Sequence, residues 1–113
     1  MKSRKSRLTL TAPVFAALGD PVRLAMVSRL CHDGPLTTIL LKQATKVTRQ
    51  AVTKHLQVLE EAGIVQSERV GRDRLWQIEV KRLVQIRTYL EQISAEWDAS
   101  LDRLRSFVEG EAK

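Results

Sequence analysis

Sulfur and aromatic side chains are scarce in this sequence of 113 residues, which holds a single cysteine, Cys31, and few tryptophans, tyrosines and phenylalanines. One cysteine cannot form an intrachain disulfide, and its isolation favours a reducing compartment, so we expect a cytoplasmic protein. No stretch approaches the ~20 consecutive apolar residues of a membrane-spanning helix, and we therefore expect no membrane partner.

Metal ligands are equally rare, because only Cys31, His32 and His55 offer a thiol or an imidazole nitrogen. A tetrahedral site needs about four such soft or borderline ligands. Cys31 and His32 are adjacent, and on a helix they would point about 100° apart, which keeps them from sharing one ion. We interpret Cys31 as a buried, inert thiol and His32 as a side chain that interacts with a helix C-terminus. The sequence thus predicts neither a metal nor another cofactor.

Catalytic groups are also missing. We find no pair of nucleophile and base, and no pair of carboxylates, at a spacing useful for chemistry. A chain of this length has room for one compact domain and an appended element or two, and a deep substrate cleft would be cramped. A hydrophobic content of 43% and a charged content of 28% are ordinary for a folded protein. We expect a folded protein that is not an enzyme.

Positive charge is abundant and unevenly distributed. Residues 1–82 hold 15 basic and 7 acidic side chains, a net charge of +8, whereas residues 83–113 hold 4 and 6, a net charge of −2. The sequence pI is about 10.0. A basic field confined to one part of the chain favours a polyanion as partner, with nucleic acid ahead of a membrane surface. Solubility alone is the alternative explanation of this charge.

Helix-start and helix-stop residues divide the chain into short elements. Residues 1–11 carry Lys2, Arg4, Lys5 and Arg7 with almost nothing to bury, and are predicted to form a flexible basic arm. A first short helix is expected to begin at Pro13. Further along, Asp20 and Thr48 are suited to cap helices, and Gly34 and Gly63 to end them. The predicted helices cover residues 13–18, 21–31, 39–44, 49–62 and 81–109.

Residues 45–47 form a tight connection between the third and fourth of these helices, a spacing typical of a helix-turn-helix. Two β-rich segments, 64–70 and 75–80, flank Gly71-Arg72-Asp73, which predicts a hairpin with Asp73 shaping the turn. The sequence therefore indicates a mainly α fold with a small β-hairpin wing. We divide it into an arm at 1–11, a winged helix-turn-helix at 12–80 and a terminal helix at 81–113.

The helix that begins after Thr48 has two distinct faces. One is apolar, with Ala51, Val52, Leu56 and Leu59 at helical spacing, and His55 lies among them. The other is polar without being acidic, and its side chains are of the types that contact base edges and phosphates in a major groove. A merely solvated face would show the same pattern. The predicted DNA-binding residues of this helix and its preceding turn are Arg49, Gln50, Thr53, Lys54, Gln57 and Lys46.

The hairpin places three arginines, Arg69, Arg72 and Arg74, around its tip. Guanidinium groups there can lie along phosphates or enter a narrow minor groove. The alternative is a charged edge that deters strand pairing. Because the recognition-like helix directly precedes the hairpin, we favour contact with double-stranded DNA.

The terminal segment repeats apolar residues in steps of three, four and seven, which predicts a long helix with one apolar face. A winged domain of this size cannot cover the whole face, so we expect self-association, with the first helix contributing to the same layer. Packing on its own domain is the alternative. The predicted dimer interface comprises Val14, Phe15, Leu18, Leu83, Ile86, Leu90, Ile93, Trp97, Leu101 and Leu104.

Three blocks of sequence resemble the ArsR family of winged-helix repressors, in the family's order and spacing: Phe15-Ala-Ala-Leu-Gly-Asp-Pro-Val-Arg-Leu24, Ala51-Val-Thr-Lys-His-Leu-Gln-Val-Leu-Glu-Glu-Ala-Gly-Ile-Val65 and Arg69-Val-Gly-Arg-Asp-Arg-Leu-Trp76. The resemblance covers about residues 12–80. It implies a homodimeric repressor that binds an imperfect palindrome in DNA. It also implies that a signal relieves the repression. It also implies that Arg49, Gln50, Thr53 and Lys54 meet DNA from the recognition helix, and Arg72 and Arg74 from the wing.

The chain departs from that family in the residues that sense metals. Where many members carry a Cys-x-Cys pair, this sequence reads Leu36-Thr-Thr-Ile-Leu-Leu-Lys42, and its last helix contains no histidine. Lys46 replaces a family glycine in the turn and would be strained if its backbone were left-handed.

We therefore predict a cytoplasmic, homodimeric DNA-binding regulator, a repressor of an inverted-repeat operator, without metal sensing. The sequence does not indicate the inducer. The alternatives are a metal- or redox-responsive repressor that senses through Cys31, and a winged-helix module for protein interaction.

Overall fold

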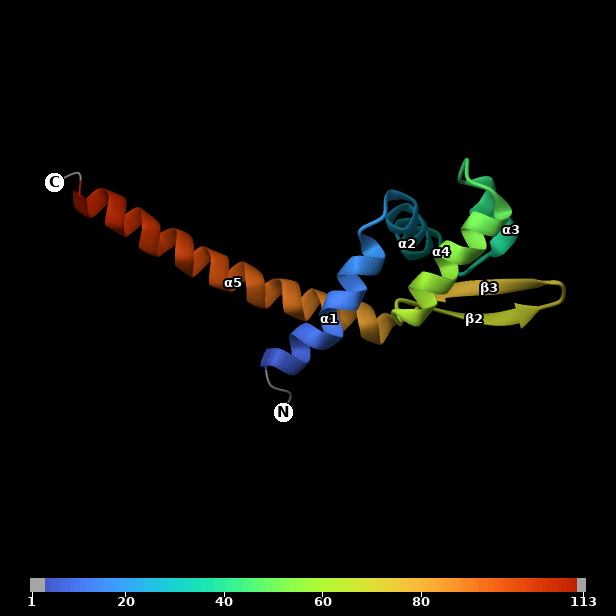
Figure 1. The fold of residues 1–113 in the computed structure, drawn as a ribbon, viewed down its shortest axis with the longest axis horizontal. Helices are drawn as coiled ribbons and strands as arrows, with labels where there is room; N and C mark the ends of the chain where they lie inside the picture. Colours follow the sequence, from blue (N-terminus) through green and yellow to red (C-terminus); the bar gives the residue numbers. More distant parts are fainter. Residues whose placement is uncertain (1–3, 112–113) are drawn as a thin grey trace. The chain divides into compact units, whose positions relative to one another are not determined.

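A computed structural model describes the backbone of residues 4–111 and the side chains of residues 11–110. The chain forms two compact units, one ending at Leu83 and the other beginning at Val84. Within the described residues the elements run, in order, α1 (Arg4–Leu18), α2 (Pro21–Asp33), β1 (Leu36–Thr37), α3 (Thr38–Gln43), α4 (Arg49–Glu61), β2 (Val65–Val70), β3 (Asp73–Ile78) and α5 (Val80–Glu111) (Figure 1). None of the helices in these residues is long and apolar enough to cross a bilayer.

Helix α1 begins at Arg4, so the prediction that the first helix starts at Pro13 is wrong. Pro13 lies inside the helix. Proline lacks the N–H that would bond to the carbonyl of Thr9, but the helix continues on both sides of this single missing bond. The helical segment includes residues 4–11 of the expected arm. The basic side chains of that arm, Lys2, Arg4, Lys5 and Arg7, lie outside the described part of the structure.

The capping residues behave as their chemistry predicts. The Asp20 carboxylate accepts hydrogen bonds from the backbone N–H groups of Val22 and Arg23, and Pro21 occupies the first turn of α2. Thr37 and Thr48 cap α3 and α4 through their hydroxyl oxygens, at 3.3 Å from Leu40 N and 3.1 Å from Ala51 N. These caps satisfy N–H groups that have no partner inside the helix. The predicted helix-turn-helix is therefore present as α3 and α4.

A glycine ends α4 in a Schellman motif. Gly63, whose φ is 76°, donates its N–H to the Glu60 carbonyl at 2.9 Å, and Ile64 donates to the Leu59 carbonyl at 3.0 Å. This pattern closes a helix through a left-handed residue, and an apolar contact across the motif accompanies it. Leu59 and Ile64 are both fully buried. The motif thus turns the chain from the recognition helix directly into β2.

The wing is a three-stranded antiparallel sheet with the order β1-β3-β2. In the β2–β3 hairpin Val70 pairs with Asp73, which leaves Gly71 and Arg72 as a two-residue turn. The φ of Gly71 is 61°, the conformation that the first position of a type II′ turn requires. The short strand β1, which was not predicted from the sequence, pairs Leu36 with Trp76 along the other edge of β3.

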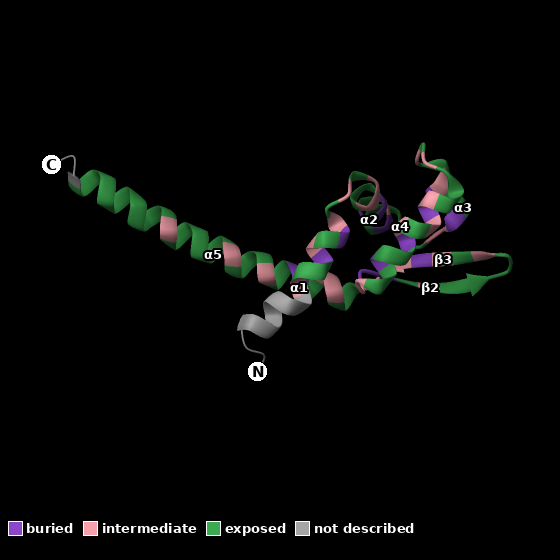
Figure 2. Ribbon diagram, in the orientation of Figure 1, coloured by how far each residue is buried: buried purple, intermediate pink, exposed green. Residues whose placement is uncertain are grey.

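The core of the first unit lies where α1, α2, α3 and α4 meet the sheet (Figure 2). Trp76 anchors the sheet: it is 2% exposed, and its indole N–H donates to the Thr38 hydroxyl at 2.9 Å. That hydroxyl is the buried partner a buried tryptophan needs. The apolar face of α4 contributes three completely buried side chains to this core: Val52, Leu56 and Leu59.

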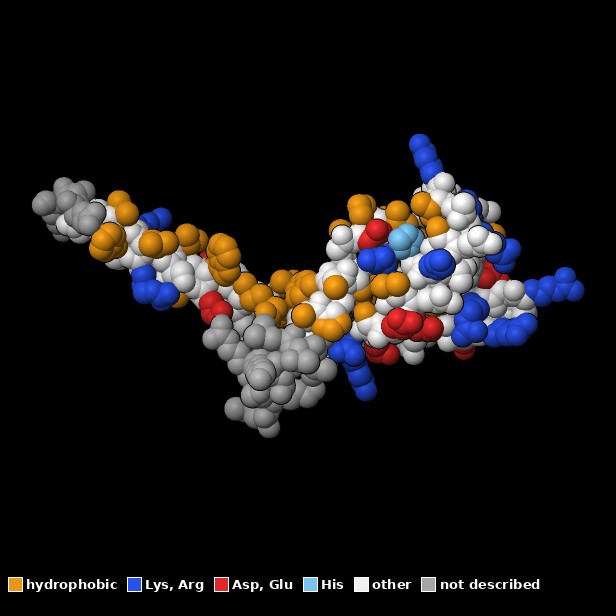
Figure 3. Space-filling model, in the orientation of Figure 1, with side chains coloured by type: hydrophobic (Ala, Val, Ile, Leu, Met, Phe, Trp, Pro, Cys, Tyr) orange, Lys and Arg blue, Asp and Glu red, His pale blue; other side chains and the backbone are white. Residues whose placement is uncertain are grey.

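The second unit is the part of α5 from Val84 onward. The helix spans 32 residues in total, which corresponds to about 48 Å at 1.5 Å per residue. Many of its apolar residues stand exposed, as Figure 3 shows in orange. Trp97, Leu101 and Leu104 are 63%, 57% and 61% exposed, respectively.

Candidate nucleic-acid interface

The outer face of α4 carries polar side chains that are available to a ligand. Arg49, Gln50, Lys54 and Gln57 are exposed, and Thr53 is half-buried. The Thr53 hydroxyl donates to the Arg49 carbonyl at 3.1 Å, which fixes its rotamer and leaves its methyl group for apolar contact. Such a methyl suits the thymine methyl of a base pair. The structure therefore brings the predicted residues of α4 together on one solvent-facing surface.

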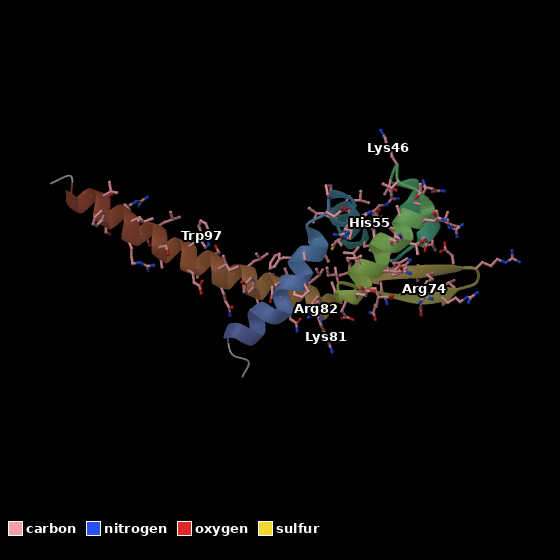
Figure 4. The ribbon with its side chains drawn as sticks, in the orientation of Figure 1. Lys46, His55, Arg74, Lys81, Arg82 and Trp97 are labelled. Carbon is pink, nitrogen blue, oxygen red and sulfur yellow. The ribbon has the colours of Figure 1, made fainter. Side chains whose placement is uncertain are left out.

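Lys46 lies in the turn that precedes α4, and its side chain extends into solvent (Figure 4). The expected strain is absent, because among the described residues only glycines have a positive φ. Lys46 thus occupies the turn without a left-handed backbone. Its ammonium group adds positive charge to the surface formed by α3, α4 and the wing. Figure 3 shows lysine and arginine side chains gathered there.

The three wing arginines have different environments. Arg69 donates through Nε to the Gly71 carbonyl at 3.2 Å, and so fastens the turn. Arg74 donates from Nε and Nη2 to the Ser67 hydroxyl oxygen at 3.1 and 3.0 Å. Ser67 in turn donates to Glu60 at the end of α4, at 2.6 Å. Within the described residues no partner contacts the guanidinium of Arg72, which sits at the tip. Of the three wing arginines, Arg72 is therefore the one most available to a phosphate.

Asp73, which pairs with Val70 across the hairpin turn, also ties the wing to the helix-turn-helix. Its carboxylate accepts the N–H of Ile39, in the first turn of α3, at 3.2 Å and the N–H of Arg74 at 2.7 Å. Burial acts to raise the pKa of Asp73. The hydrogen bonds from Arg74, Thr38 and Ile39 outweigh burial and lower the pKa below its usual 3.8. The ionised carboxylate is therefore the form that holds β3 against α3.

Replacing Asp73 by asparagine should weaken this link. A carboxylate near a helix N-terminus contributes about 0.3–1 kcal/mol, and we expect a loss in that range near neutral pH. Because the folded-state pKa is lowered, the contribution is present above the unfolded value of 3.8 and disappears as the pH falls through the folded value. Urea unfolding at pH 7 and at pH 3 measures it. Asp98→Asn, on α5, is the control, and an Asp73→Asn difference that persists unchanged at pH 3 would contradict the assignment.

Cys31 is exposed, so the prediction of a buried thiol is wrong. It follows the buried Leu30 in the last turns of α2, and one step of about 100° along the helix carries it from the core face to solvent. His32 lies in the last turn of α2, where it was expected. Among the described residues no three His, Cys, Asp or Glu side chains are grouped as a metal site would require.

The residues expected at a dimer interface differ in exposure. Val14 and Ile86 are already buried in the single chain, at 2% and 8% exposed. Phe15, Leu18, Leu83 and Ile93 are half-buried. The exposed residues lie along α5, and Phe107 and Val108 extend the apolar stripe beyond the predicted set: Leu90, Trp97, Leu101, Leu104, Phe107 and Val108.

Two features of the site are not evident from the sequence. Asp73 bonds to Ile39, far earlier in the chain, and the Glu60–Ser67–Arg74 chain joins residues of α4, β2 and β3; the partners in both depend on strand register. The only sequence signal is the presence of Asp73 beside the turn, which equally suggests a turn residue. The α4 face, by contrast, follows from helical periodicity alone.

Comparison with known proteins agrees with this geometry. Residues 18–68 match a family described as a helix-turn-helix domain. The chain is 35% identical to the HTH-type transcriptional regulator Rv2034 of Mycobacterium tuberculosis over 97 residues, which are 86% of this chain and 87% of that protein. It is 33% identical to the HTH-type transcriptional repressor SmtB of the same organism over 79 residues, 70% of this chain and 58% of that protein.

Among solved structures, an ArsR-like transcriptional regulator from Rhodococcus sp. RHA1 superposes with a TM-score of 0.72 at 33% identity, over 88% of this chain and 92% of that one. The predicted winged helix-turn-helix fold is thereby confirmed. The resemblance to the ArsR family, on which the expectation of DNA binding partly rested, is also confirmed. The chain belongs to the ArsR family of winged helix-turn-helix, DNA-binding transcriptional regulators.

Proposed function

We propose that the chain is a homodimeric repressor that binds an inverted-repeat operator, reads it with α4 and anchors to it with the wing. The observation that carries this proposal is the division of α4. Its inner face is fixed in the core by Val52, Leu56 and Leu59, all fully buried, while its outer face is polar and not acidic. A rigid helix with such a face suits a major groove. Similarity to the repressor SmtB supports repression as the outcome of binding.

Reading and anchoring are assigned to different residues. Gln50 and Thr53 lie in the first turns of α4, where a recognition helix approaches base edges. Gln50 can bond an adenine edge with both its amide oxygen and its amide nitrogen. Arg72 lies at the wing tip with its guanidinium available, so we assign it to phosphate or to a narrow minor groove. Lys46, Arg49, Lys54, Gln57, Arg69 and Arg74 complete the proposed interface.

Self-association is proposed from the apolar stripe of α5. A monomeric protein rarely leaves large apolar residues exposed along one helix face. A second copy has the same stripe, and a two-fold axis would match the symmetry of an inverted repeat. The proposed interface comprises the α1 and α5 residues predicted from the sequence: Val14, Phe15, Leu18, Leu83, Ile86, Leu90, Ile93, Trp97, Leu101 and Leu104. We propose that repression does not depend on a metal ion, since the chain has so few ligands of the required types.

Titration of DNA tests the assignment of reader and anchor. A duplex selected by the wild-type protein from a random-sequence library serves as operator, and a scrambled duplex of equal composition as reference. Gln50→Ala should weaken binding to the selected duplex by about 1–3 kcal/mol and binding to the scrambled duplex less. Arg72→Ala should weaken both duplexes by similar factors. It should also reduce the salt slope by about one unit for each phosphate that is no longer neutralised, or about two per dimer.

Matched controls separate these effects from general damage. Gln66→Ala on β2 and Arg105→Ala on α5 remove the same side-chain types at exposed positions away from the proposed interface. Both should leave affinity and salt slope unchanged. If Arg72→Ala abolished the preference for the selected duplex while Gln50→Ala weakened both duplexes equally, the two roles would be reversed. A wild-type protein that selected no duplex would contradict the proposed function.

A further inference from the structure

Arg23 joins three helices at the corner between α1 and α2. From its place in the first turn of α2, its Nε donates to the Ala17 carbonyl near the end of α1 at 2.6 Å. Its Nη1 lies 3.2 Å from Nδ1 of His55, in the middle of α4. Asp20, the N-cap of α2, has its Oδ1 4.0 Å from the same imidazole nitrogen. One guanidinium thus connects α1 and α2 to the recognition helix.

The contact between Arg23 and His55 constrains the state of the imidazole. Arginine nitrogens carry hydrogens in every accessible protonation state and can only donate. Nδ1 of His55 must therefore accept, which requires a neutral ring with its hydrogen on Nε2. A proton on Nδ1 would remove the acceptor and place two positive charges 3.2 Å apart. The contact can exist only while His55 is neutral.

The charged groups around His55 come from one side. Asp20 and Arg23 face the ring, and no charged side chain of α3 or β2 within the described residues forms an ion pair or a hydrogen bond with it. The backbone N–H of Arg23, together with that of Val22 and the nearby charge of Arg23, lowers the pKa of Asp20 against the opposing effect of burial. Asp20 is therefore an ionised group held by the N-terminus of α2. It is the group toward which a protonated His55 would move when Arg23 withdraws.

Packing leaves this corner open. A cleft of about 380 Å³ lies between α1, α2 and α4, and Arg23 lines it together with Val58 and Glu61 of α4. Pro13, Ala16 and Ala17 of α1 form its other wall. Protein interiors are otherwise close-packed, so this cleft leaves the second half of α4 with fewer packing contacts on that side. The Arg23–His55 contact is a polar tie beside this gap.

His55 stands next to residues that would meet DNA. Lys54 precedes it directly, and Thr53 and Gln57 lie two positions to either side along α4. A small rotation of α4 about its axis would move His55 and these side chains together. Protein–DNA base contacts depend on placement to within about 0.5 Å, so a change in the tie would alter reading of bases more than attraction to phosphates.

We infer that Arg23 is a positioning residue for DNA reading: through neutral His55 it fixes the orientation of the recognition helix, and protonation of His55 releases it. This inference rests on the proposed function, and it adds a proton-dependent step to it. Sequence-specific binding should weaken in mild acid. Binding to unrelated DNA should be unchanged or slightly stronger, because protonation adds positive charge.

The test measures dissociation constants for the selected and scrambled duplexes between about pH 8 and pH 5.5, the range in which imidazoles change charge. At constant ionic strength the wild-type protein should lose about tenfold in preference for the selected duplex over this range. His55→Asn places an uncharged acceptor near the position of Nδ1, and its preference should not depend on pH. His32→Asn, which removes the other histidine, should behave like the wild type.

Arg23→Lys tests the positioning role at pH 8. A lysine cannot reach the Ala17 carbonyl and His55 with two fixed donors, so the preference should fall about tenfold while the melting temperature shows a folded protein. Chemical shifts of the imidazole nitrogens of His55 report whether Nδ1 carries a proton.

A wild-type preference that is independent of pH would overturn the inference, as would a pH dependence that persists in His55→Asn. A protonated Nδ1 at pH 8 would also overturn it. Failure of the wild-type protein to select any duplex is a different result, because it would contradict the proposed function itself and the inference with it.

Discussion

Replacing Leu104 by aspartate is expected to convert the dimer into a monomer and to weaken binding of the selected duplex by at least about a hundredfold, because two linked modules gain about 10²–10⁴ in avidity over one. Leu104 is 61% exposed in the single chain, so the substitution should cost the fold of the chain little. In a dimer the same position would bring carboxylates into an apolar seam, where an unpaired charge is strongly unfavourable. Ile93→Asp, in the same stripe, should act likewise.

The control for this prediction lies on the opposite side of the helix. Ala95 is exposed and stands two residues from both Ile93 and Trp97, a step that points away from the stripe. Ala95→Asp should leave a dimer with unchanged affinity. Light scattering gives the masses, and titration of the duplex gives the affinities. A Leu104→Asp protein with the mass of the wild type, or a wild-type protein that is itself a monomer, would refute the proposed interface.

The parts of the fold that sequence reasoning predicted are those determined by neighbours in the chain. Asp20 and Thr48 cap helices because their side chains reach N–H groups two or three residues away. Gly71 forms the hairpin turn because its backbone tolerates a positive φ. The outer face of α4 follows from the periodicity of its buried residues. Each of these features depends on a local interaction, which a sequence displays directly.

The features that were missed depend on contacts between distant segments. Strand β1 forms because Leu36 and Thr37 pair with the free edge of β3, which lies much later in the sequence. Asp73 serves α3 because strand register places it beside Ile39. Cys31 was expected to be buried from its residue type, but its position one step beyond Leu30 on α2 decides its exposure. Tertiary placement determines these outcomes, and residue type alone does not.

Gly63 gives the second large effect that we expect, because two independent costs meet at this residue. Its φ of 76° is a conformation that costs a residue with a Cβ about 1–2 kcal/mol. A Cβ at this position would also lie 2.7 Å from Nη2 and 2.9 Å from Nε of Arg82. Arg82, near the start of α5, is shown in Figure 4. The guanidinium would have to move away from its present position.

Gly63→Ala should therefore lower the free energy of unfolding by about 2–3 kcal/mol, the range typical of strain at a special φ combined with a steric conflict. The two costs can be separated with Arg82→Ala as background: there Gly63→Ala should cost only the backbone strain, about 1–2 kcal/mol. Gly110→Ala is the control, since Gly110 lies in the last turn of α5 with nothing within 4 Å of an added Cβ, and alanine there should change the free energy of unfolding by less than about 0.5 kcal/mol.

Urea unfolding followed by circular dichroism measures the wild type and all of these variants, provided that the slope of the transition stays constant. If Gly63→Ala cost the same in both backgrounds, the conflict with Arg82 would contribute nothing and only the left-handed backbone would explain the glycine. If Gly63→Ala changed the free energy of unfolding no more than Gly110→Ala does, the Schellman closure of α4 would not need a glycine at all. The expected loss instead follows from the positive φ of Gly63 and from the Arg82 side chain that lies against it.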